Sequence, residues 1–149
     1  METAGISIRR ASPADAFIIA QLATTLGYHA DDKTIAGRLA MLADSRSDLI
    51  LVATDASRNV IGWLQAHAAQ ILESGFRVEI TGLVIAPEQR RRGAGRALVV
   101  EAEQWAKTIG AGAVVVRSNF QRIESHAFYP ALGYAATKTQ NVYRKTLAQ

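Results

Sequence analysis

Apolar residues recur along the chain with two spacings, one close to the turn of a helix and one close to the alternation of a strand. The helical spacing predicts four helices, at about Pro13–Leu26, from Asp31 or Asp32 to about Ala43, Gly93–Ile109 and Gln121–Leu132, the last of them bent or broken around Pro130. Runs of β-branched and aliphatic residues predict strands at Ile6–Ile8, Leu49–Thr54, Val60–Ala69, Arg77–Ile85 and Ala113–Arg117, then a final hairpin-like pair, Tyr134–Lys138 with Val142–Lys145. The resulting order, β-α-α-β-β-β-α-β-α-β-β, predicts an α+β (α/β layered) fold, with helices covering a mixed central sheet of about seven strands.

Turn and capping residues support these boundaries. Ser12 is a capping residue directly before Pro13, and proline is favoured in the first turn of a helix. Gly27 follows the last apolar position of the first predicted helix and is expected to end it. The turn residues Ser57–Asn59 join two strands, so the three strands between Leu49 and Ile85 are expected to form an antiparallel meander.

Composition points to one soluble domain covering residues 1–149. The chain has 149 residues, of which 49% are hydrophobic and 20% charged, and it contains no cysteine. Disulfide scaffolds, thiolate metal sites and cysteine nucleophiles are therefore excluded. No apolar run approaches the roughly 20 residues of a membrane span, and the first residues lack the apolar core of a secretion signal. We expect an untargeted cytoplasmic protein with no membrane partner.

Charge is distributed unevenly between the two halves of the sequence. Residues 1–75 carry six Lys/Arg and eight Asp/Glu, whereas residues 76–149 carry eleven and five. The balances are therefore −2 and +6, which together give the net charge of +4. A basic half indicates an anionic partner, such as a nucleic acid, a lipid surface or a phosphorylated small molecule.

A basic, glycine-containing loop lies between the predicted strand ending at Ile85 and the helix beginning near Gly93. Glycines allow the backbone to approach a ligand closely, and the first N–H groups of a helix attract phosphate. A dinucleotide-binding fingerprint would require glycine where the chain has Leu98, and the Gly-Lys-Ser/Thr of a Walker loop is absent. The loop therefore predicts a phosphate cradle of another kind.

The loop sequence Arg90-Arg91-Arg92-Gly93-Ala94-Gly95 and the later run from Phe128 to Tyr134 both resemble motifs of the GNAT acetyltransferases. Arg90-Arg91-Arg92-Gly93-Ala94-Gly95 matches the family's pyrophosphate-loop pattern, Gln/Arg-x-x-Gly-x-Gly/Ala. Asn119, followed by the run Phe128-Tyr129-Pro130-Ala131-Leu132-Gly133-Tyr134, matches the second signature, an asparagine and then an aromatic-Tyr-x-x-x-Gly-aromatic run. The predicted order of elements also fits this GNAT-like fold.

The resemblance implies an acetyl-coenzyme A-dependent N-acetyltransferase in which the amine attacks the thioester directly in a ternary complex. The implied cofactor-binding residues are Leu83, Val84, Ile85, Arg90, Arg91, Arg92, Gly93, Ala94, Gly95, Arg96 and Asn119. The resemblance gives Tyr129 the protonation of the leaving thiolate, with Val84 as the expected backbone donor to the carbonyl oxygen. Glu79 lies fourteen residues before Gly93, the register of a base in some members. It can equally be an exposed strand residue or the ion-pair partner of an arginine.

The expected acceptor is a primary amine of a small molecule. A protein or peptide amine is the alternative within the same chemistry, and a non-catalytic coenzyme A sensor or a nucleic-acid-binding module is the alternative of another class. A helix-turn-helix pattern and paired exposed aromatics are absent, so no nucleic acid is expected. Acidic residues in the first half, Asp31, Asp32, Asp44 and Asp48, favour a cationic acceptor.

No metal is expected, because His29, His67 and His126 lack the spacing of metal ligands. Of these, His67 lies on the third predicted strand and could face the acceptor, although an ordinary strand histidine is the simpler interpretation. The resemblance also allows a homodimer, since many members of the family pair.

Overall fold

The computed structural model describes residues 5–25, 27–117 and 123–148 and divides the chain into two compact units, residues 1–117 and 118–149. The strands are β1 (Ser7–Arg10), β2 (Asp48–Thr54), β3 (Val60–Ile71), β4 (Gly75–Ile85) and β5 (Val114–Val116). The helices are α1 (Ala16–Thr25), α2 (Asp32–Leu42), α3 (Ala94–Thr108) and α4 (Ile123–Ala131), with short 3-10 helices η1 (Pro13–Asp15) and η2 (Pro87–Gln89). The prediction of a single domain over 1–149 stays a prediction.

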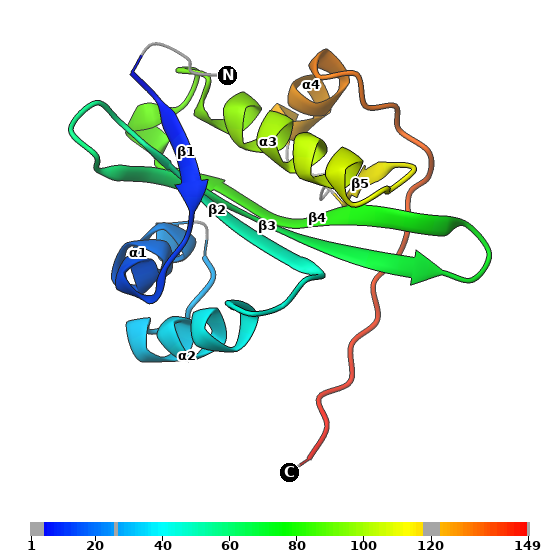
Figure 1. Ribbon diagram of the computed structural model, residues 1–149, viewed down its shortest axis with the longest axis horizontal. Helices are drawn as coiled ribbons and strands as arrows, with labels where there is room; N and C mark the ends of the chain where they lie inside the picture. Colours follow the sequence, from blue (N-terminus) through cyan, green and yellow to red (C-terminus); the bar gives the residue numbers. More distant parts are fainter. Residues whose placement is uncertain (1–4, 26, 118–122, 149) are drawn as a thin grey trace. The chain divides into compact units, whose positions relative to one another are not determined.

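The first unit is built around one mixed sheet in the order β1-β2-β3-β4-β5 (Figure 1). The pairs from β1 to β4 are antiparallel, as predicted for the meander, and β5 joins β4 in parallel. This arrangement confirms the α+β class. The sheet has five strands rather than the predicted seven or so, because the final hairpin is absent from it.

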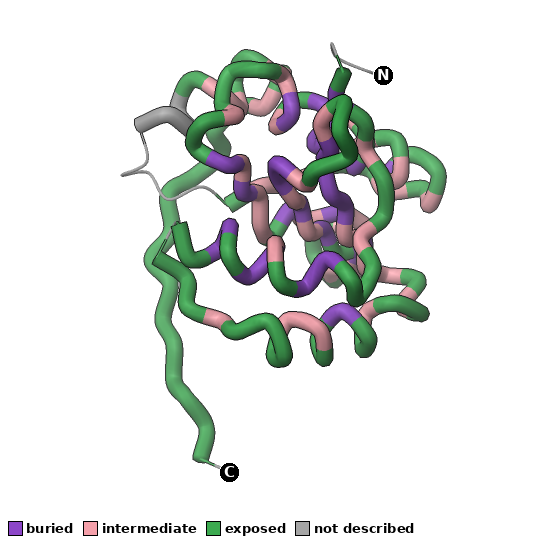
Figure 2. Tube along the Cα trace, turned by 90° about the vertical axis from the view of Figure 1, so that its left-hand side faces the viewer, coloured by how far each residue is buried: buried purple, intermediate pink, exposed green. Residues whose placement is uncertain are grey.

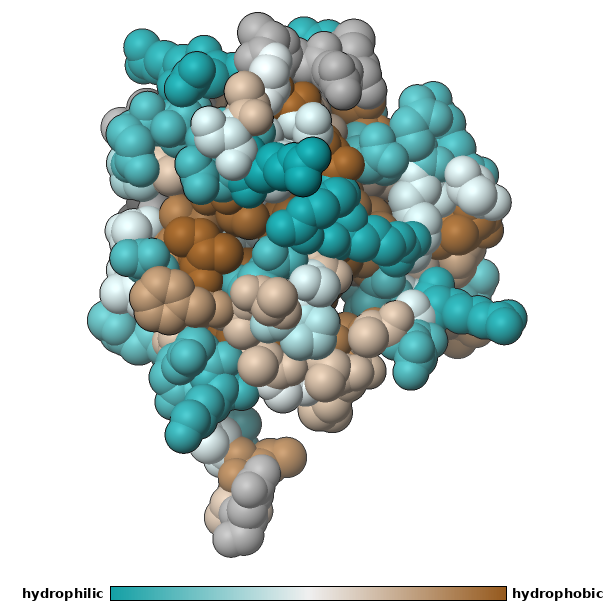
Figure 3. Space-filling view, turned by 60° about the vertical axis from the view of Figure 1, so that its left-hand side comes forward, coloured by the Kyte–Doolittle hydropathy of each residue, from teal (hydrophilic) through white to brown (hydrophobic). Residues whose placement is uncertain are grey.

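Helices cover the two faces of this sheet (Figure 1). Side chains of α1 and α2 pack on one face against Val52 and Trp63, and α3 contacts β2, β3 and β4. The face toward α1 and α2 carries the even-numbered residues of β2 and, through the strand register, the odd-numbered residues of β3. Both helices also leave large apolar side chains on the surface, Phe17 and Met41, and Figure 3 shows such hydrophobic patches among polar ones. No helix among the described residues is long and apolar enough to cross a membrane.

An ion pair anchors the start of the first helical segment. Asp15 is almost fully buried and receives hydrogen bonds from Arg9 Nη1 and Nη2, each 2.8 Å long, and from the Ser12 backbone N–H at 2.8 Å. Ser12 and Asp15 form a capping box, which confirms Ser12 as the capping residue. The hydrogen bonds from Arg9 outweigh the effect of burial and hold the pKa of the Asp15 carboxyl below its ordinary value.

Replacing Asp15 by asparagine is expected to destabilise the protein by about 1–3 kcal/mol at neutral pH, because a buried charged partner is lost. A carboxyl with a lowered folded-state pKa stabilises fully above its unfolded pKa of about 3.9 and loses this contribution as pH falls through the folded-state value. The difference between wild type and Asp15→Asn should therefore shrink under acid. Urea unfolding at pH 7 and below pH 4 checks this, with the exposed Asp44→Asn as control. A pH-independent difference would contradict it.

The second unit is described for α4 and the segment after it. The backbone closes α4 with N–H bonds from Gly133 to the Pro130 carbonyl at 3.0 Å and from Tyr134 to the Tyr129 carbonyl at 3.1 Å. Together with φ 93° at Gly133, these bonds form a Schellman motif, which requires a left-handed residue. The helix therefore passes through Pro130 and ends one residue later, at Ala131, instead of breaking at the proline.

The predicted strands Tyr134–Lys138 and Val142–Lys145 are wrong. Residues 135–148 form no helix or strand and are exposed throughout (Figure 2). Val142, Tyr143 and Leu147 are among the most exposed apolar side chains described, with 87%, 89% and 76% of their surface accessible. The sequence pattern has strand propensity, but an isolated hairpin without a third strand or a packed face is only marginally stable.

Candidate acetyl-coenzyme A and acceptor site

Part of β4 has one unpaired edge. On the side away from β3, β5 pairs only with Val78–Ile80, and no described strand pairs with Thr81–Ile85 on that side. This open edge spans about 16 Å at the usual strand rise, a length comparable with an extended pantetheine arm. It leads through η2 directly into the arginine loop. An extended ligand can therefore add to β4 by main-chain hydrogen bonds.

The ladder between β3 and β4 determines which N–H groups face this edge. The Ala86 N–H donates to the Ile61 carbonyl at 2.8 Å, and by the alternation of an antiparallel ladder the Val84 N–H also faces β3. Leu83 and Ile85 then direct their N–H groups to the open edge. The Val78 N–H donates to the Ala113 carbonyl, on the β5 side of β4. If the direction of the N–H groups alternated without interruption from Val78, the Val84 N–H would also face this side.

A bulge explains the difference. The register shifts between Gln65 and Ala66, so that Thr81 is an extra residue of β4 with no partner of its own on β3. One inserted residue changes the alternation of every later position. The structure thus directs the N–H of Leu83, and not that of the expected donor Val84, to the open edge.

Amide hydrogen exchange should follow this alternation. In the protein without coenzyme A, the Leu83 and Ile85 amides are expected to exchange much faster than the Val84 amide, because only the latter has a ladder partner. Saturating coenzyme A should slow the first two and leave Val84 unchanged. Exchange read by NMR at single amides checks this pattern, and fast exchange at Val84 in the free protein would contradict it.

The arginine loop has the geometry of an anion site. Arg91 and Gly93 both have positive φ, 66° and 91°, and Gly93 is the N-cap of α3 with no side-chain hydrogen bond. The first N–H groups of α3, from Ala94 on, thus lack both a helical and a side-chain partner. Arg90, Arg91, Arg92 and Arg96 are exposed around this helix end, and Arg92 also donates to Gln89 Oε1 at 2.7 Å. The loop therefore fits a pyrophosphate.

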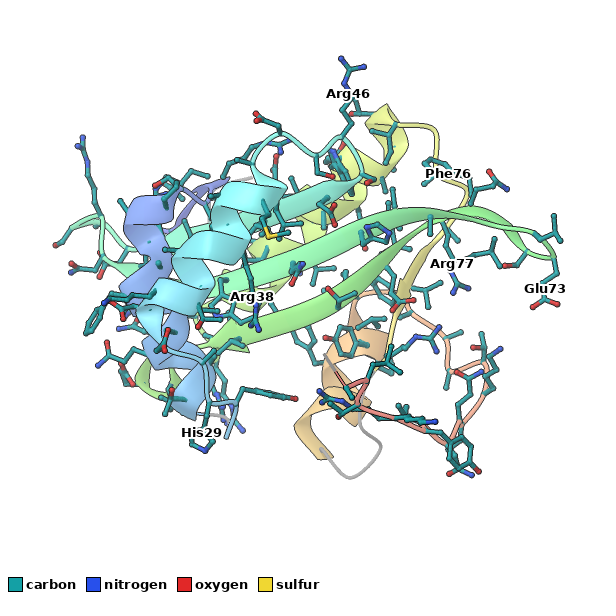
Figure 4. All side chains as sticks on the ribbon, turned by 90° about the horizontal axis from the view of Figure 1, so that it is seen from below. His29, Arg38, Arg46, Glu73, Phe76 and Arg77 are labelled. Carbon is teal, nitrogen blue, oxygen red and sulfur yellow. The ribbon has the colours of Figure 1, made fainter. Side chains whose placement is uncertain are left out.

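Glu79 lies beside two arginines. Its Oε2 accepts from Arg117 Nε at 3.2 Å, and its Oε1 is 3.6 Å from Arg77 Nη2. The Glu79 side chain is 22% exposed, so the pair is partly shielded from water. In Figure 4, Arg77 lies on the part of the β3–β4 ribbon that α1 and α2 leave uncovered. The ion-pair interpretation of Glu79 is thus realised in the structure.

A second polar cluster, which the sequence did not identify, lies one strand away. His67 Nδ1 and Asp48 Oδ1 are 2.9 Å apart, and Ser45 Oγ donates to Asp48 Oδ2 at 2.6 Å. Burial acts against the charged form of Asp48, but the hydrogen bonds from Ser45 and His67 outweigh it and keep the pKa of this carboxyl below its ordinary value. The turn at Ser57–Asn59 could have predicted this pair, because both residues lie about equally far from it along the hairpin.

The other acidic residues expected to favour a cationic acceptor have separate roles. Asp31 is the N-cap of α2 and accepts from the Thr34 N–H at 2.7 Å. Asp32 and Asp44 are exposed, in the first turn of α2 and in the turn before β2. The four residues therefore do not act as one cluster.

Gly82, the residue after the bulge, lies in close contact with the Trp63 ring. An ideal Cβ at Gly82 would lie 2.8 Å from Trp63 Cζ3 and 3.0 Å from its Cη2, so glycine is needed for the indole to lie across β4. Trp63 packs with Leu22 and Val84 in the apolar cluster under α1, and its Nε1 is buried without a hydrogen-bond partner.

Tyr129 belongs to the second unit and is described there. Its ring packs edge to face on Phe128, with centroids 4.9 Å apart, and on Tyr134 at 5.9 Å. The Tyr134 contact is the apolar contact that accompanies a Schellman motif, which explains the spacing of the aromatic-Tyr-x-x-x-Gly-aromatic run. Asn119 lies outside the described residues.

Three comparisons identify similar proteins. The acetyltransferase (GNAT) family model matches residues 17–134. An aminoglycoside N(6')-acetyltransferase type 1 of Stenotrophomonas maltophilia is 27% identical over 145 residues, 95% of this chain and 94% of that protein. An aminoglycoside 6'-N-acetyltransferase of Acinetobacter baumannii superposes with a TM-score of 0.82 at 23% identity, over 97% of this chain and 100% of that one. An aminoglycoside N-acetyltransferase in complex with coenzyme A superposes at 0.83 and 19% identity, over 94% of each chain.

The family match covers most of the chain and both structural units, and it agrees with the open edge of β4 and the uncapped end of α3. Members of this family are acyltransferases that use acetyl-coenzyme A. The protein belongs to the GNAT acetyltransferase family.

Proposed function

We propose that the protein transfers the acetyl group of acetyl-coenzyme A to a primary amine of a small molecule, by direct attack in a ternary complex. The observation that carries the proposal is the continuity of the open β4 edge with the N-terminus of α3, whose N-cap Gly93 offers no side-chain partner to the first N–H groups. A single extended ligand with a diphosphate at one end and a thioester at the other fits both. Relatives that are aminoglycoside acetyltransferases support a small-molecule acceptor.

Two groups of residues hold the cosubstrate in this proposal. The backbone of Leu83–Ile85 pairs with the pantetheine arm, with the N–H groups of Leu83 and Ile85 as donors. The N–H groups of Gly93–Arg96 and the guanidinium groups of the loop bind the phosphates. Asn119 is proposed to bind the pantetheine arm as well.

Chemistry requires a donor to the carbonyl oxygen, a proton for the thiolate and a neutral amine. The outward Leu83 N–H is the proposed donor to the oxygen. Tyr129 is the proposed acid for the thiolate, because a phenol is a neutral donor at pH 7. Glu79 is proposed to attract the ammonium group of the acceptor to the β4 side of the site. The chain has no cysteine for an acetyl-enzyme, which fits direct attack.

Product analysis tests the proposal. Purified protein is incubated with acetyl-coenzyme A and, separately, with sisomicin, spermidine, benzylamine and a lysine-containing peptide, and acetylated products are measured by mass spectrometry. Amide formation on a small amine with a higher kcat/KM than on the peptide is expected. Acetylation of the peptide alone would move the acceptor class to proteins, and tight cofactor binding without any amide product would favour a sensor.

A further inference from the structure

The Asp48–His67 pair has the arrangement of a histidine held for proton transfer. Asp48 and His67 are directly opposite in the register of β2 and β3. They form a non-hydrogen-bonded pair of the ladder, the kind in which opposite side chains are closest. A carboxylate can only accept, so the 2.9 Å contact makes Nδ1 of the imidazole the donor. In the neutral ring, Nε2 is then the atom without a proton. Asp48 thus fixes both the tautomer and the orientation of His67.

Asp48 is itself immobilised. Ser45 Oγ binds its second carboxylate oxygen at 2.6 Å and lies 3.2 Å from Ser47 Oγ. The Asp48 side chain is only 13% exposed, whereas that of His67 is 48% exposed. Ser45 thus holds the Asp48 carboxylate, the carboxylate orients the His67 imidazole, and the imidazole is accessible from solvent. Histidine acts as a base in arrangements of this kind.

His67 also lies next to Glu79, the residue proposed to attract the acceptor. It is directly opposite Glu79 in the β3–β4 register, so Asp48, His67 and Glu79 form one polar row across three strands. The row lies on the face of the sheet toward α1 and α2, two residues along β4 from Arg77, which Figure 4 shows beyond the part that these helices cover. On β4, Glu79 comes two residues before the bulge at Thr81. It therefore lies where the pairing with β5 ends and the open edge begins.

Glu79 is poorly suited to accept the proton itself. Two guanidinium groups, those of Arg77 and Arg117, lie at 3.6 and 3.2 Å from its carboxylate oxygens. Both carboxylate oxygens of Glu79 therefore already contact guanidinium groups, whereas a base needs a free lone pair directed at the ammonium group. The His67 imidazole instead uses Nδ1 for its contact with Asp48, which leaves Nε2 to accept a proton.

We propose that His67 accepts the proton of the acceptor ammonium group, with Asp48 as the residue that positions it. This inference rests on the proposed function and deepens it by naming the base of the same site. Leu64 is the β3 partner of Leu83, so three residues, about 10 Å of strand, separate the carbonyl donor from His67. The ammonium group enters this interval, and the imidazole takes its proton across one bridging water.

The step balances without a further reagent. The imidazole removes one proton from the ammonium group, and the freed nitrogen lone pair forms the new N–C bond as the C–S bond of the thioester breaks. The leaving sulfur takes the electron pair and receives a proton from Tyr129. The nitrogen loses its second proton to solvent as the amide forms, and the Tyr129 phenolate takes a proton back from solvent. Because nearly half of the His67 side chain is exposed, the imidazolium also returns its proton to solvent.

Charged residues flank His67 on the two strands that neighbour β3. Asp48 faces it from β2, Glu79 from β4, and Arg77 lies one rung further along β4, opposite Ala69. Arg117 reaches the row through its bond to Glu79. Arg46, in the turn before β2, points away from the sheet in Figure 4. Two carboxylates therefore flank the imidazole, and the nearest arginines are engaged with Glu79.

The dependence of kcat/KM on pH tests the proposal, with acetyl-coenzyme A and the amine from the panel above that wild type acetylates fastest. Wild type should rise through the neutral range with the loss of one proton and then level off. His67→Gln should lower kcat/KM by about 10²-fold or more and lose this rise, keeping only the rise due to the amine itself. Imidazole in the buffer should partly restore His67→Ala but not wild type.

Three further variants separate base, positioning and attraction. Asp48→Asn should reduce kcat, because the imidazole loses the acceptor that fixes its tautomer and orientation; Asp44→Asn, an exposed residue in the preceding turn, should leave kcat unchanged. Glu79→Gln should raise KM while the rise remains. An unchanged rise in His67→Gln, or its loss in Glu79→Gln, would overturn the proposal.

Cofactor binding keeps this outcome separate from failure of the proposed function. His67→Gln is expected to bind acetyl-coenzyme A as tightly as wild type in calorimetry, which also shows that it is folded. If wild type acetylates no amine of the panel, the proposed function fails. If wild type is active and His67→Gln retains both its rate and its pH dependence, only the assignment of the base fails.

Discussion

Tyr129→Phe is expected to lower kcat by about 10²–10⁴-fold, the usual contribution of a positioned acid, while leaving acetyl-coenzyme A affinity unchanged. The substitution removes one hydroxyl and keeps the ring that packs on Phe128 and Tyr134. The thiolate would then leave without a protein proton donor. Steady-state release of the free thiol of coenzyme A, together with calorimetric binding, measures both quantities.

The matched control for this substitution lies in the same aromatic cluster. Tyr134→Phe removes a hydroxyl from the ring 5.9 Å away and keeps the Schellman contact, so only a small change in kcat is expected. Equal losses in the two variants would indicate a structural role for the cluster. A Tyr129→Phe enzyme with wild-type kcat would remove Tyr129 from the mechanism.

Gly93→Asp is expected to weaken acetyl-coenzyme A binding by about 10³-fold, more than any other single change in the loop. A carboxylate about 4 Å from a phosphate charge at a protein surface is repelled by about 4 kcal/mol, and each 1.4 kcal/mol is a factor of ten in Kd. Gly93 is the N-cap of α3, where such a charge would meet the phosphates directly. Titration calorimetry with acetyl-coenzyme A gives the two dissociation constants.

Gly93→Asn isolates the charge from the shape. Asparagine and aspartate have nearly the same size, and both tolerate a positive φ better than most residues. The asparagine variant should therefore carry the same backbone strain as the aspartate variant but bind far more tightly. Equal affinity in both would show that the loop does not contact phosphate.

The parts of the molecule that could be predicted from the sequence depend on local signals. The arginine loop was found because two glycines and a helix start lie within a few residues, and Gly93 has the positive φ that this pattern requires. The meander followed from apolar runs and one turn. Such features need no knowledge of distant residues.

The parts that could not be predicted depend on partners far away in the chain. The bulge at Thr81 has no marker of its own, since only the β3 register shows the extra residue, and it directs the N–H of Leu83 rather than that of Val84 to the open edge. The Asp48–His67 contact joins residues nineteen positions apart. The predicted C-terminal hairpin is wrong because its local strand propensity is not matched by pairing with the sheet.

The open edge of β4 also has a consequence for solubility. Unpaired strand edges are templates on which other chains can add, and proteins commonly cover or shorten them. Here the edge from Thr81 to Ile85 is left free of the described strands at the place where the pantetheine arm is proposed to bind. The cosubstrate then acts as the missing edge strand. Storage with coenzyme A should accordingly suppress self-association of the purified protein, which light scattering with and without coenzyme A would measure.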